Sequence, residues 1–300
     1  MERQTTLKDS FVLKGKGLHT GAFITAEFCP ADANTGYNIQ RVDLEEQPVI
    51  PCDATIVGET QRGTVLVQGD IKISTIEHAM AALYALGVDN VLIKLDGPEM
   101  PIIDGSAYYW TQNINKVGLE TLDAPREYIE IKNVIEIEGE NGEQLRIEPA
   151  DKFSVEVTTD FDSAFLGKMT AQLDNLSEFE ADYSSARTFV FVREIEPLLH
   201  MGLIKGGDLG NAIVIYEREI SQERFDALTD KLGVEHMDAS QLGYLNPKPL
   251  TWPNECTRHK LLDLIGDLSL LRKPIKGKVT AYKPGHGINN KFARTILNNI

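Results

Sequence analysis

The sequence predicts an α+β protein of two domains, and three observations support this prediction. The chain has 300 residues, and at roughly 100–200 residues per domain this length favours two hydrophobic cores. Short apolar segments between turn residues, which are typical of strands, alternate with a few strongly patterned helices. The stretches 78–97 and 259–287 each place a histidine near the start of a helix, followed by a strand and a glycine-containing loop. Duplication of one α+β unit would explain this similarity.

The composition is that of an ordinary globular protein, with 42% hydrophobic and 25% charged residues. The net charge of −15 and the lack of any Lys/Arg block argue against a non-specific binder of nucleic acid or anionic membranes. An anionic small substrate would therefore need a few local cations. No apolar run reaches the ~18 residues of a membrane helix, and the N-terminus has no signal-peptide pattern. We expect a cytoplasmic protein without a membrane segment.

The first part of the chain is expected to form short strands and two helices. Ser74 is a plausible N-cap of a helix with Glu77 three residues on, which is capping-box spacing, and Gly87 would end this helix. A strand over 90–95 and a second helix near 108–117 follow. The strands expected before the first helix are Phe11–Leu13, Ile24–Phe28, Tyr37–Gln40 and Thr64–Val67.

A domain boundary is expected near 123–127, where a polar stretch contains a proline, which gives domains over 1–123 and 127–300. A strong helix begins around Thr257, because apolar residues from Leu261 to Leu271 cover one wide helical face. The other elements expected in this part are strands over 128–137, 144–148, 153–159 and 277–282, and helices over 225–232 and from Asn290.

Three cysteines (Cys29, Cys52 and Cys256) are an odd number without a C-x-x-C motif. This pattern favours buried, reduced thiols over a disulfide framework. Cys256 precedes His259 by three residues, but no second cysteine is close enough in sequence to support a soft-metal site.

Two histidines and an aspartate form the candidate metal site. His259 and Asp263 are spaced i, i+4 and so leave one helix face together; the alternative is a solvated polar pair. His78 begins the other strong helix, and a His–His–Asp set leaves a fourth coordination position open, as catalytic zinc sites do. Zinc suits this donor set, and iron would fit as well.

Other polar residues near these ligands are candidates for the chemistry. Glu77 precedes His78 and is either a general base or only part of a capping box. His286 lies between two glycines, in a catalytic loop or a plain surface turn, and Asp267, eight residues after His259, would keep it protonated. Lys260 is a candidate phosphate anchor, and His19 is another imidazole in a glycine-rich segment.

Six motifs together resemble the zinc-dependent UDP-3-O-acyl-N-acetylglucosamine deacetylase (LpxC) family of the lipid A pathway. They occur in the family's order across nearly the whole chain: GKGLHTG (15–21), STIEHAMAAL (74–83), DGSA (104–107), ARTF (186–189), RHKLLDLIGDL (258–268) and AYKPGHGINNK (281–291). The resemblance implies two similar α+β domains, each a small β-sheet layered with two helices and carrying an insert. It also implies removal of the N-acetyl group from the UDP-linked, acylated amino sugar, with release of acetate.

The resemblance also implies roles for individual residues. The zinc ligands would be His78, His259 and Asp263, with Glu77 as general base and His286, oriented by Asp267, as the protonated partner. Thr188 would donate a hydrogen bond to the oxyanion. The uridine diphosphate would meet Lys260 and Phe161, and an insert over about 189–216 would hold the acyl chain. The substrate contacts expected there and nearby are Phe189, Leu203, Val214 and His19.

The sequence departs from the family pattern after Phe161, where DSAFLG replaces the usual His-Pro pair, and the stretch 221–258 is long. In some bacteria this deacetylase is fused to a hydroxyacyl-carrier-protein dehydratase (FabZ), so the chain is expected to be the first part of such a fusion. Two other interpretations stay open from the residues: a zinc deacetylase of another acetamido sugar, and a non-catalytic module with a structural metal.

Overall fold

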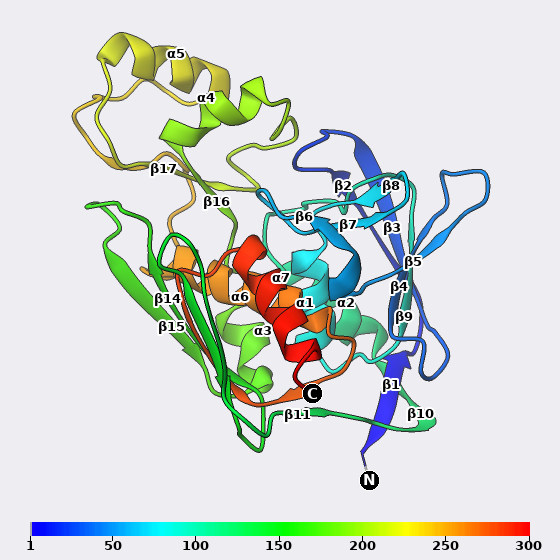
Figure 1. The fold of residues 1–300 in the computed structure, drawn as a ribbon. Coiled ribbons are helices and arrows are strands. Elements are labelled where there is room, and N and C mark those ends of the chain that lie inside the picture. The colour runs from blue at the N-terminus through cyan, green and yellow to red at the C-terminus, as the bar shows by residue number, and fades with distance from the viewer. Residues whose placement is uncertain (1) are drawn as a thin grey trace.

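The computed structural model describes residues 2–300 and has an α+β architecture. Helices from both halves of the chain lie between two five-stranded sheets, and smaller sheets flank this three-layer body (Figure 1). Most buried apolar side chains of both halves belong to one continuous core. The α+β class expected from the sequence is confirmed.

The first five-stranded sheet is formed by the first half of the chain, in the order β2-β3-β9-β4-β5. Neighbouring strands are antiparallel except β4 and β9, which are parallel. The strands are β2 (Phe11–Lys16), β3 (Phe23–Cys29), β4 (Tyr37–Arg41), β5 (Val49–Pro51) and β9 (Val91–Leu95), and the helices of this half are α1 (Glu77–Ala85) and α2 (Tyr108–Val117).

The second five-stranded sheet repeats this topology, in the order β12-β13-β20-β14-β15, with β14 and β20 as its one parallel pair. Helix α6 precedes β20 and α7 follows it, as α1 and α2 flank β9. The duplication expected from the sequence is therefore present in the fold. The elements are β12 (Ile135–Glu138), β13 (Gln144–Glu148), β14 (Ser154–Asp160), β15 (Lys168–Leu173), α6 (Glu255–Ser269), β20 (Lys278–Tyr282) and α7 (His286–Leu297).

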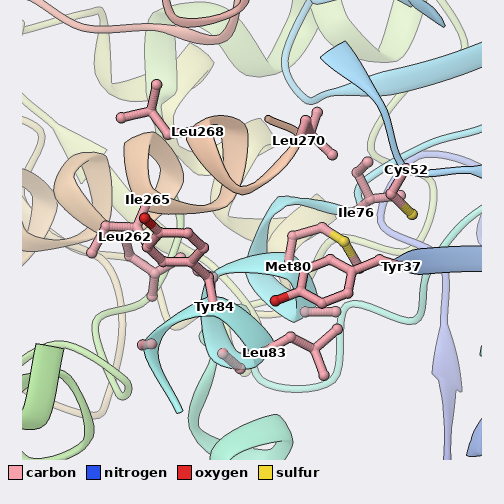
Figure 2. Packing of buried hydrophobic residues seen from close by; sticks show 14 of the residues in the cluster. Tyr37, Cys52, Ile76, Met80, Leu83, Tyr84, Leu262, Ile265, Leu268 and Leu270 are labelled. Carbon is pink, nitrogen blue, oxygen red and sulfur yellow. The ribbon is translucent and has the colours of Figure 1, made fainter. Parts of the chain in front are cut away.

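The two equivalent helices α1 and α6 pack against each other at the centre of the molecule. Met80, Leu83 and Tyr84 of α1 and Leu262 and Ile265 of α6 lie in one buried layer (Figure 2). This burial explains why both helices are rich in apolar residues on more than one face.

The two helices approach each other closely at Gly266. A Cβ atom there would lie 2.1 Å from the carbonyl oxygen of Glu77, so only glycine lets α6 approach the first turn of α1 this closely. That turn also carries His78. The helix crossing thus determines where side chains from the two halves can meet.

Each half carries an insert between the fourth strand of its five-stranded sheet to occur in the sequence (β5 or β15) and the helix at the centre of the molecule (α1 or α6). The first insert is a small sheet of β6 (Val57–Glu59), β7 (Val65–Gln68) and β8 (Ile71–Ile73), preceded by the short helix η1 (Ala54–Ile56). The second is larger: it contains one small core of its own, and a further small core joins it to Leu166 and to Cys256 of α6. Its elements are β16 (Phe189–Phe191), α4 (Val192–His200), β17 (Ile213–Tyr216), α5 (Gln222–Leu232) and β18 (Gly243–Tyr244), after η2 (Leu176–Glu178) and α3 (Phe179–Asp182). Both inserts lie at the end of the molecule away from β1 and the C-terminus (Figure 1).

Two further short strand pairs lie outside these sheets. Strand β1 (Arg3–Leu7) pairs with β10 (Leu119–Pro125), and β11 (Ile129–Glu130) pairs with β19 (Ile275–Lys276). The long strand expected over 128–137 is wrong, because the chain forms β11 and β12 with a break between them. The domain limits 1–123 and 127–300 stay a prediction.

Two helix starts differ from the sequence prediction. Ser74 is not an N-cap: its backbone bridges to Glu99, and α1 begins after Ile76 with no side-chain cap. Glu77 accepts a hydrogen bond from the Thr64 backbone instead of forming a capping box. The last helix begins at His286 rather than near Asn290, so His286 belongs to a first helical turn.

The three cysteines are buried and unpaired, as the sequence indicates. Within residues 2–300, none of the helices has both the length and the apolar character needed to cross a bilayer.

Candidate active site

Helices α1 and α6 bring the expected metal ligands together. His78, near the start of α1, meets His259 and Asp263 on the facing side of α6, and one ligand atom from each lies within 4.8 Å of the other two. All three side chains are buried. Among residues 2–300, this is the one group of three or more His, Cys, Asp or Glu side chains with such spacing.

Both imidazoles are held in a form suited to metal binding. The Nδ1 of His259 lies 2.9 Å from the carbonyl oxygen of Ala186, so Nδ1 donates a hydrogen bond and Nε2 is left with its lone pair. Burial, together with the neighbouring His259, lowers the pKa of His78 to about 3. Burial also lowers the pKa of His259. Neutral rings with a free nitrogen are what a divalent cation requires.

Asp263 provides the test of whether a cation fits. Its Oδ1 is 3.3 Å from the Nε2 of His259 and 3.7 Å from that of His78, yet it has no hydrogen-bond partner among the described residues. Burial would raise the pKa of Asp263, but His259 and Lys260 lower it below its usual range. A buried carboxylate oxygen without a partner, facing two imidazole nitrogens, suits a metal ion that accepts all three ligands.

Glu77 adjoins this group and is almost fully buried. One oxygen, Oε2, accepts a hydrogen bond of 3.1 Å from the Thr64 backbone N–H. Burial raises the pKa of Glu77 to about 7, although the nearby His286 lowers it. A carboxylate in this state can exchange a proton near neutral pH, which is the property of a general base.

His286 lies next to the three candidate ligands, with its Nε2 3.8 Å from Asp263 Oδ2. Its Nδ1 lies 2.9 Å from Asp267 Oδ2, so the pairing expected from the sequence is present in the structure. Burial would lower the pKa of His286, but the contact with Asp267 raises it to about 9. Asn289 donates a further hydrogen bond to the same Asp267 oxygen.

Thr188 belongs to the ARTF segment and immediately precedes β16. Its backbone N–H donates to Gly105 of the DGSA motif, and its carbonyl accepts from Ile213. Sequence analysis did not identify the anchor of this segment: Arg187 forms a buried ion pair of 2.8 Å with Glu255, the first residue of α6. The sequence indicated such a pair only through Arg187 itself, which lies within ARTF, the motif whose threonine was assigned to catalysis.

A cavity of about 80 Å³ lies between the second insert and three residues of the first half of the chain. Thr188, Phe189, Val214 and His19 line it, together with Leu18, Arg62, Val190, Ile195, Leu198, Ile204, Gly207, Asp208, Ala212 and Leu232. Leu203 is not among the lining residues; the next residue in the chain, Ile204, lines the cavity instead. Both ring nitrogens of His19 are buried without a hydrogen-bond partner in the described structure.

An aromatic cluster connects Phe161 with the candidate metal group. The ring centroids of Phe161 and Phe189 are 5.2 Å apart, and Phe189 lies 6.3 Å from the ring of His259. Lys260 lies over Phe189 and forms an ion pair of 2.8 Å with Asp263. The ammonium group of Lys260 therefore already has an anionic partner, the carboxylate of Asp263.

Sequence analysis did not identify two further lysines, Lys168 and Lys283, that lie near Asp160, the residue before Phe161. Lys168 and Lys283 both lie over the ring of Tyr282, whose hydroxyl donates to Asp160. They come from β15 and from the residue after β20, which lie on either side of β14 in the sheet. The two lysines are far apart in the sequence, and only the strand order of the sheet places both beside Tyr282. One indication of a functional lysine was present in the sequence, because Lys283 lies within the AYKPGHG motif.

The fold and the site together define an α+β protein with a candidate metal centre where two copies of one unit meet. The family model of UDP-3-O-acyl N-acetylglycosamine deacetylases (LpxC) matches residues 4–230 and 237–298. The chain belongs to this family.

Three relatives illustrate the range of similarity. The chain is 57% identical to the bifunctional enzyme LpxC/FabZ of Bacteroides thetaiotaomicron and 54% identical to that of Porphyromonas gingivalis, in each case over all of this chain and 65% of the relative. It is 37% identical to the UDP-3-O-acyl-N-acetylglucosamine deacetylase of Myxococcus xanthus, over 98% of this chain and 86% of the relative. The chain thus spans about two thirds of the length of the two bifunctional relatives.

Proposed function

We propose that this chain is a zinc-dependent hydrolase in lipid A synthesis that removes the N-acetyl group from UDP-3-O-acyl-N-acetylglucosamine and releases acetate. The observation that supports it most is the buried His78–His259–Asp263 group with Glu77 and His286 beside it. A structural metal site needs no general base next to a ligand and no protonated imidazole facing the group. A cytoplasmic location and a dehydratase fused to this chain are part of the same proposal.

A zinc ion held by these three residues would act as a Lewis acid toward the acetamido carbonyl. Glu77 accepts a proton from the attacking water through Oε1, because Oε2 is bonded to the Thr64 backbone. The Thr188 hydroxyl donates a hydrogen bond to the oxygen that becomes negative.

His286 completes the reaction. Its Nε2 proton goes to the departing nitrogen as the carbon–nitrogen bond breaks, which yields the free amine and acetate. Asp267 holds the opposite ring nitrogen and so keeps Nε2 directed toward the reacting atoms.

The parts of the substrate are assigned to separate surfaces. The acyl chain enters the cavity lined by Phe189 and Val214, which is mostly apolar. The nucleotide diphosphate lies along Phe161 and Lys260, with Lys283 as a further cation near the phosphates.

Glu77→Gln tests the proposal, because the amide keeps the size of the side chain and can still accept from Thr64 but cannot accept the proton. We expect zinc content to be unchanged and kcat/KM for deacetylation to fall by about 10²–10⁴. Unchanged activity would contradict a catalytic role. Equal rates with UDP-N-acetylglucosamine lacking the acyl chain would instead favour another acetamido sugar as the substrate. Metal analysis of protein purified without added zinc separates zinc from iron.

A further inference from the structure

Thr64 is a fully buried polar residue that none of these catalytic steps uses. It immediately precedes β7 and therefore belongs to the first insert. It comes from neither helix that supplies the candidate ligands nor from α7. A buried hydroxyl must find hydrogen-bond partners inside the protein, and those of Thr64 are the candidate catalytic groups.

The side chain of Thr64 contacts both members of the Asp267–His286 pair. Its hydroxyl donates to Asp267 Oδ1 and lies 3.2 Å from His286 Nδ1. The other carboxylate oxygen, Oδ2, accepts from His286 Nδ1 at 2.9 Å and from Asn289 at 2.8 Å. Both oxygens of Asp267 are therefore bonded, and the hydroxyl of Thr64 prevents the carboxylate from rotating away from the imidazole.

The backbone of Thr64 contacts the other side of the site. Its N–H donates to Glu77 Oε2 at 3.1 Å. The preceding residue is Gly63, and a Cβ atom there would lie 3.2 Å from Glu77 Oε1, a tight contact. The segment 63–64 thus bonds one oxygen of Glu77 and leaves space beside the other.

We propose that Thr64 is a positioning residue that fixes Glu77 and the Asp267–His286 pair relative to each other, and that holding this residue in place is the role of the first insert. The inference rests on the proposed function, since it assigns the proton acceptor and donor to these groups. One residue bonded to both keeps their separation constant through the reaction, which preorganises the site.

A purely structural role would predict the same hydrogen bonds, so the test must separate the hydroxyl from the shape of the side chain. Thr64→Val keeps the shape and the backbone N–H but removes the hydroxyl. Thr64→Ser keeps the hydroxyl and removes a methyl group. We expect Thr64→Val to lower kcat by about 10- to 100-fold, the range for a lost hydrogen bond to a charged group. KM and zinc content should change little. Thr64→Ser should retain most of the wild-type kcat.

A second readout does not depend on activity. In zinc-loaded protein labelled with ¹⁵N-histidine, the Nδ1–H resonance of His286, assigned with His286→Gln, should shift in Thr64→Val and stay in place in Thr64→Ser. If the wild type does not deacetylate the substrate, the proposed function fails while this resonance still tests the contact. If Thr64→Val does not fold, Thr64→Ala against Thr64→Ser gives the same contrast. Equal kcat in Val and Ser variants, or an unshifted resonance in Thr64→Val, overturns the proposal.

Discussion

Helix α1 of the first half supplies Glu77 and His78 to the site, whereas its equivalent in the second half, α6, supplies one imidazole and two carboxylates. The two sheets have the same strand order and the same single parallel pair, and the two helices occupy equivalent places in them. The inserts differ: the first is a three-stranded sheet, whereas the second has a core of its own and supplies most of the lining of a cavity. The repeated part forms the scaffold, and the candidate site lies where its two copies meet.

The comparison predicts first that neither half can hold the metal alone. His78→Ala removes the only candidate ligand from α1, and His259→Ala removes one of two from α6. Mutations of outer-shell partners already cost about 10- to 100-fold in metal affinity or activity, so loss of a ligand should cost more than 100-fold. Metal content after dialysis and deacetylase activity check this. The exposed His200→Ala is the control. Full zinc content in His78→Ala would refute a site shared by both halves.

A second prediction concerns the first residues of the two equivalent helices, α7 and α2. His286 begins α7 and contacts the site, whereas Tyr108 begins α2 and is 40% exposed. We expect His286→Gln to lower kcat by about 10²–10⁴ with zinc still bound, since the proton donor is lost, and Tyr108→Ala to have little effect. If His286→Gln empties the metal site, His286 is a ligand and not an acid.

The third prediction tests the helix crossing itself. Gly266→Ala places a Cβ 2.1 Å from the Glu77 carbonyl, so the helices must separate. Overpacking of this kind typically costs about 1–3 kcal/mol, which should appear in the free energy of unfolding measured with urea. Activity should fall as well, because Glu77 and His78 would move.

Gly243→Ala is the matched control, because no atom lies within 4 Å of a Cβ built there. We expect a change within about 0.5 kcal/mol, as for most surface substitutions. Equal stability of the two alanine variants would show that the close approach of α1 and α6 is not needed.

The sequence predicted the repeated part of the fold well, because its signals are local. Apolar periodicity located α6, and α2 has the bounds that were expected. The i, i+4 spacing of His259 and Asp263 placed both on one helix face, as the structure has them. Combining them with His78 rested on the place of His78 near the start of the other strong helix and on the resemblance to a family, since no periodicity reports which helices pack together.

The parts that sequence analysis missed depend on contacts between distant segments. Ser74 has the residue type and spacing of an N-cap, but pairing with Glu99 keeps it outside α1. Thr64 bonds to a residue 203 positions away, and nothing in its neighbourhood indicates this. Side chains that connect the two halves could be found only from the tertiary structure.

The smallest expected effect concerns the link between the two inserts. Arg62 of the first insert forms an ion pair of 2.9 Å with Glu194 on α4 of the second, with side-chain exposures of 37% and 26%. Both residues belong to the non-repeated part of the chain, so the pair shows whether the inserts behave as one unit or two. Partly exposed pairs of this kind contribute about 0.2–1 kcal/mol, and salt screens them.

A double-mutant cycle measures this contribution, and the choice of variant matters because Glu194 also accepts a hydrogen bond from the Phe191 backbone N–H at the start of α4. Glu194→Gln removes the charge while its amide oxygen can still accept that bond, whereas Glu194→Ala would lose both. Combined with Arg62→Ala, the glutamine variant should give a coupling free energy of about 0.2–1 kcal/mol at low salt, decreasing toward zero near 1 M salt. A coupling well above this range that salt does not reduce would mean that the two inserts are rigidly joined over the cavity. The inserts would then have to open together to admit an acyl chain, and the division into a repeated scaffold and two separate inserts would be wrong.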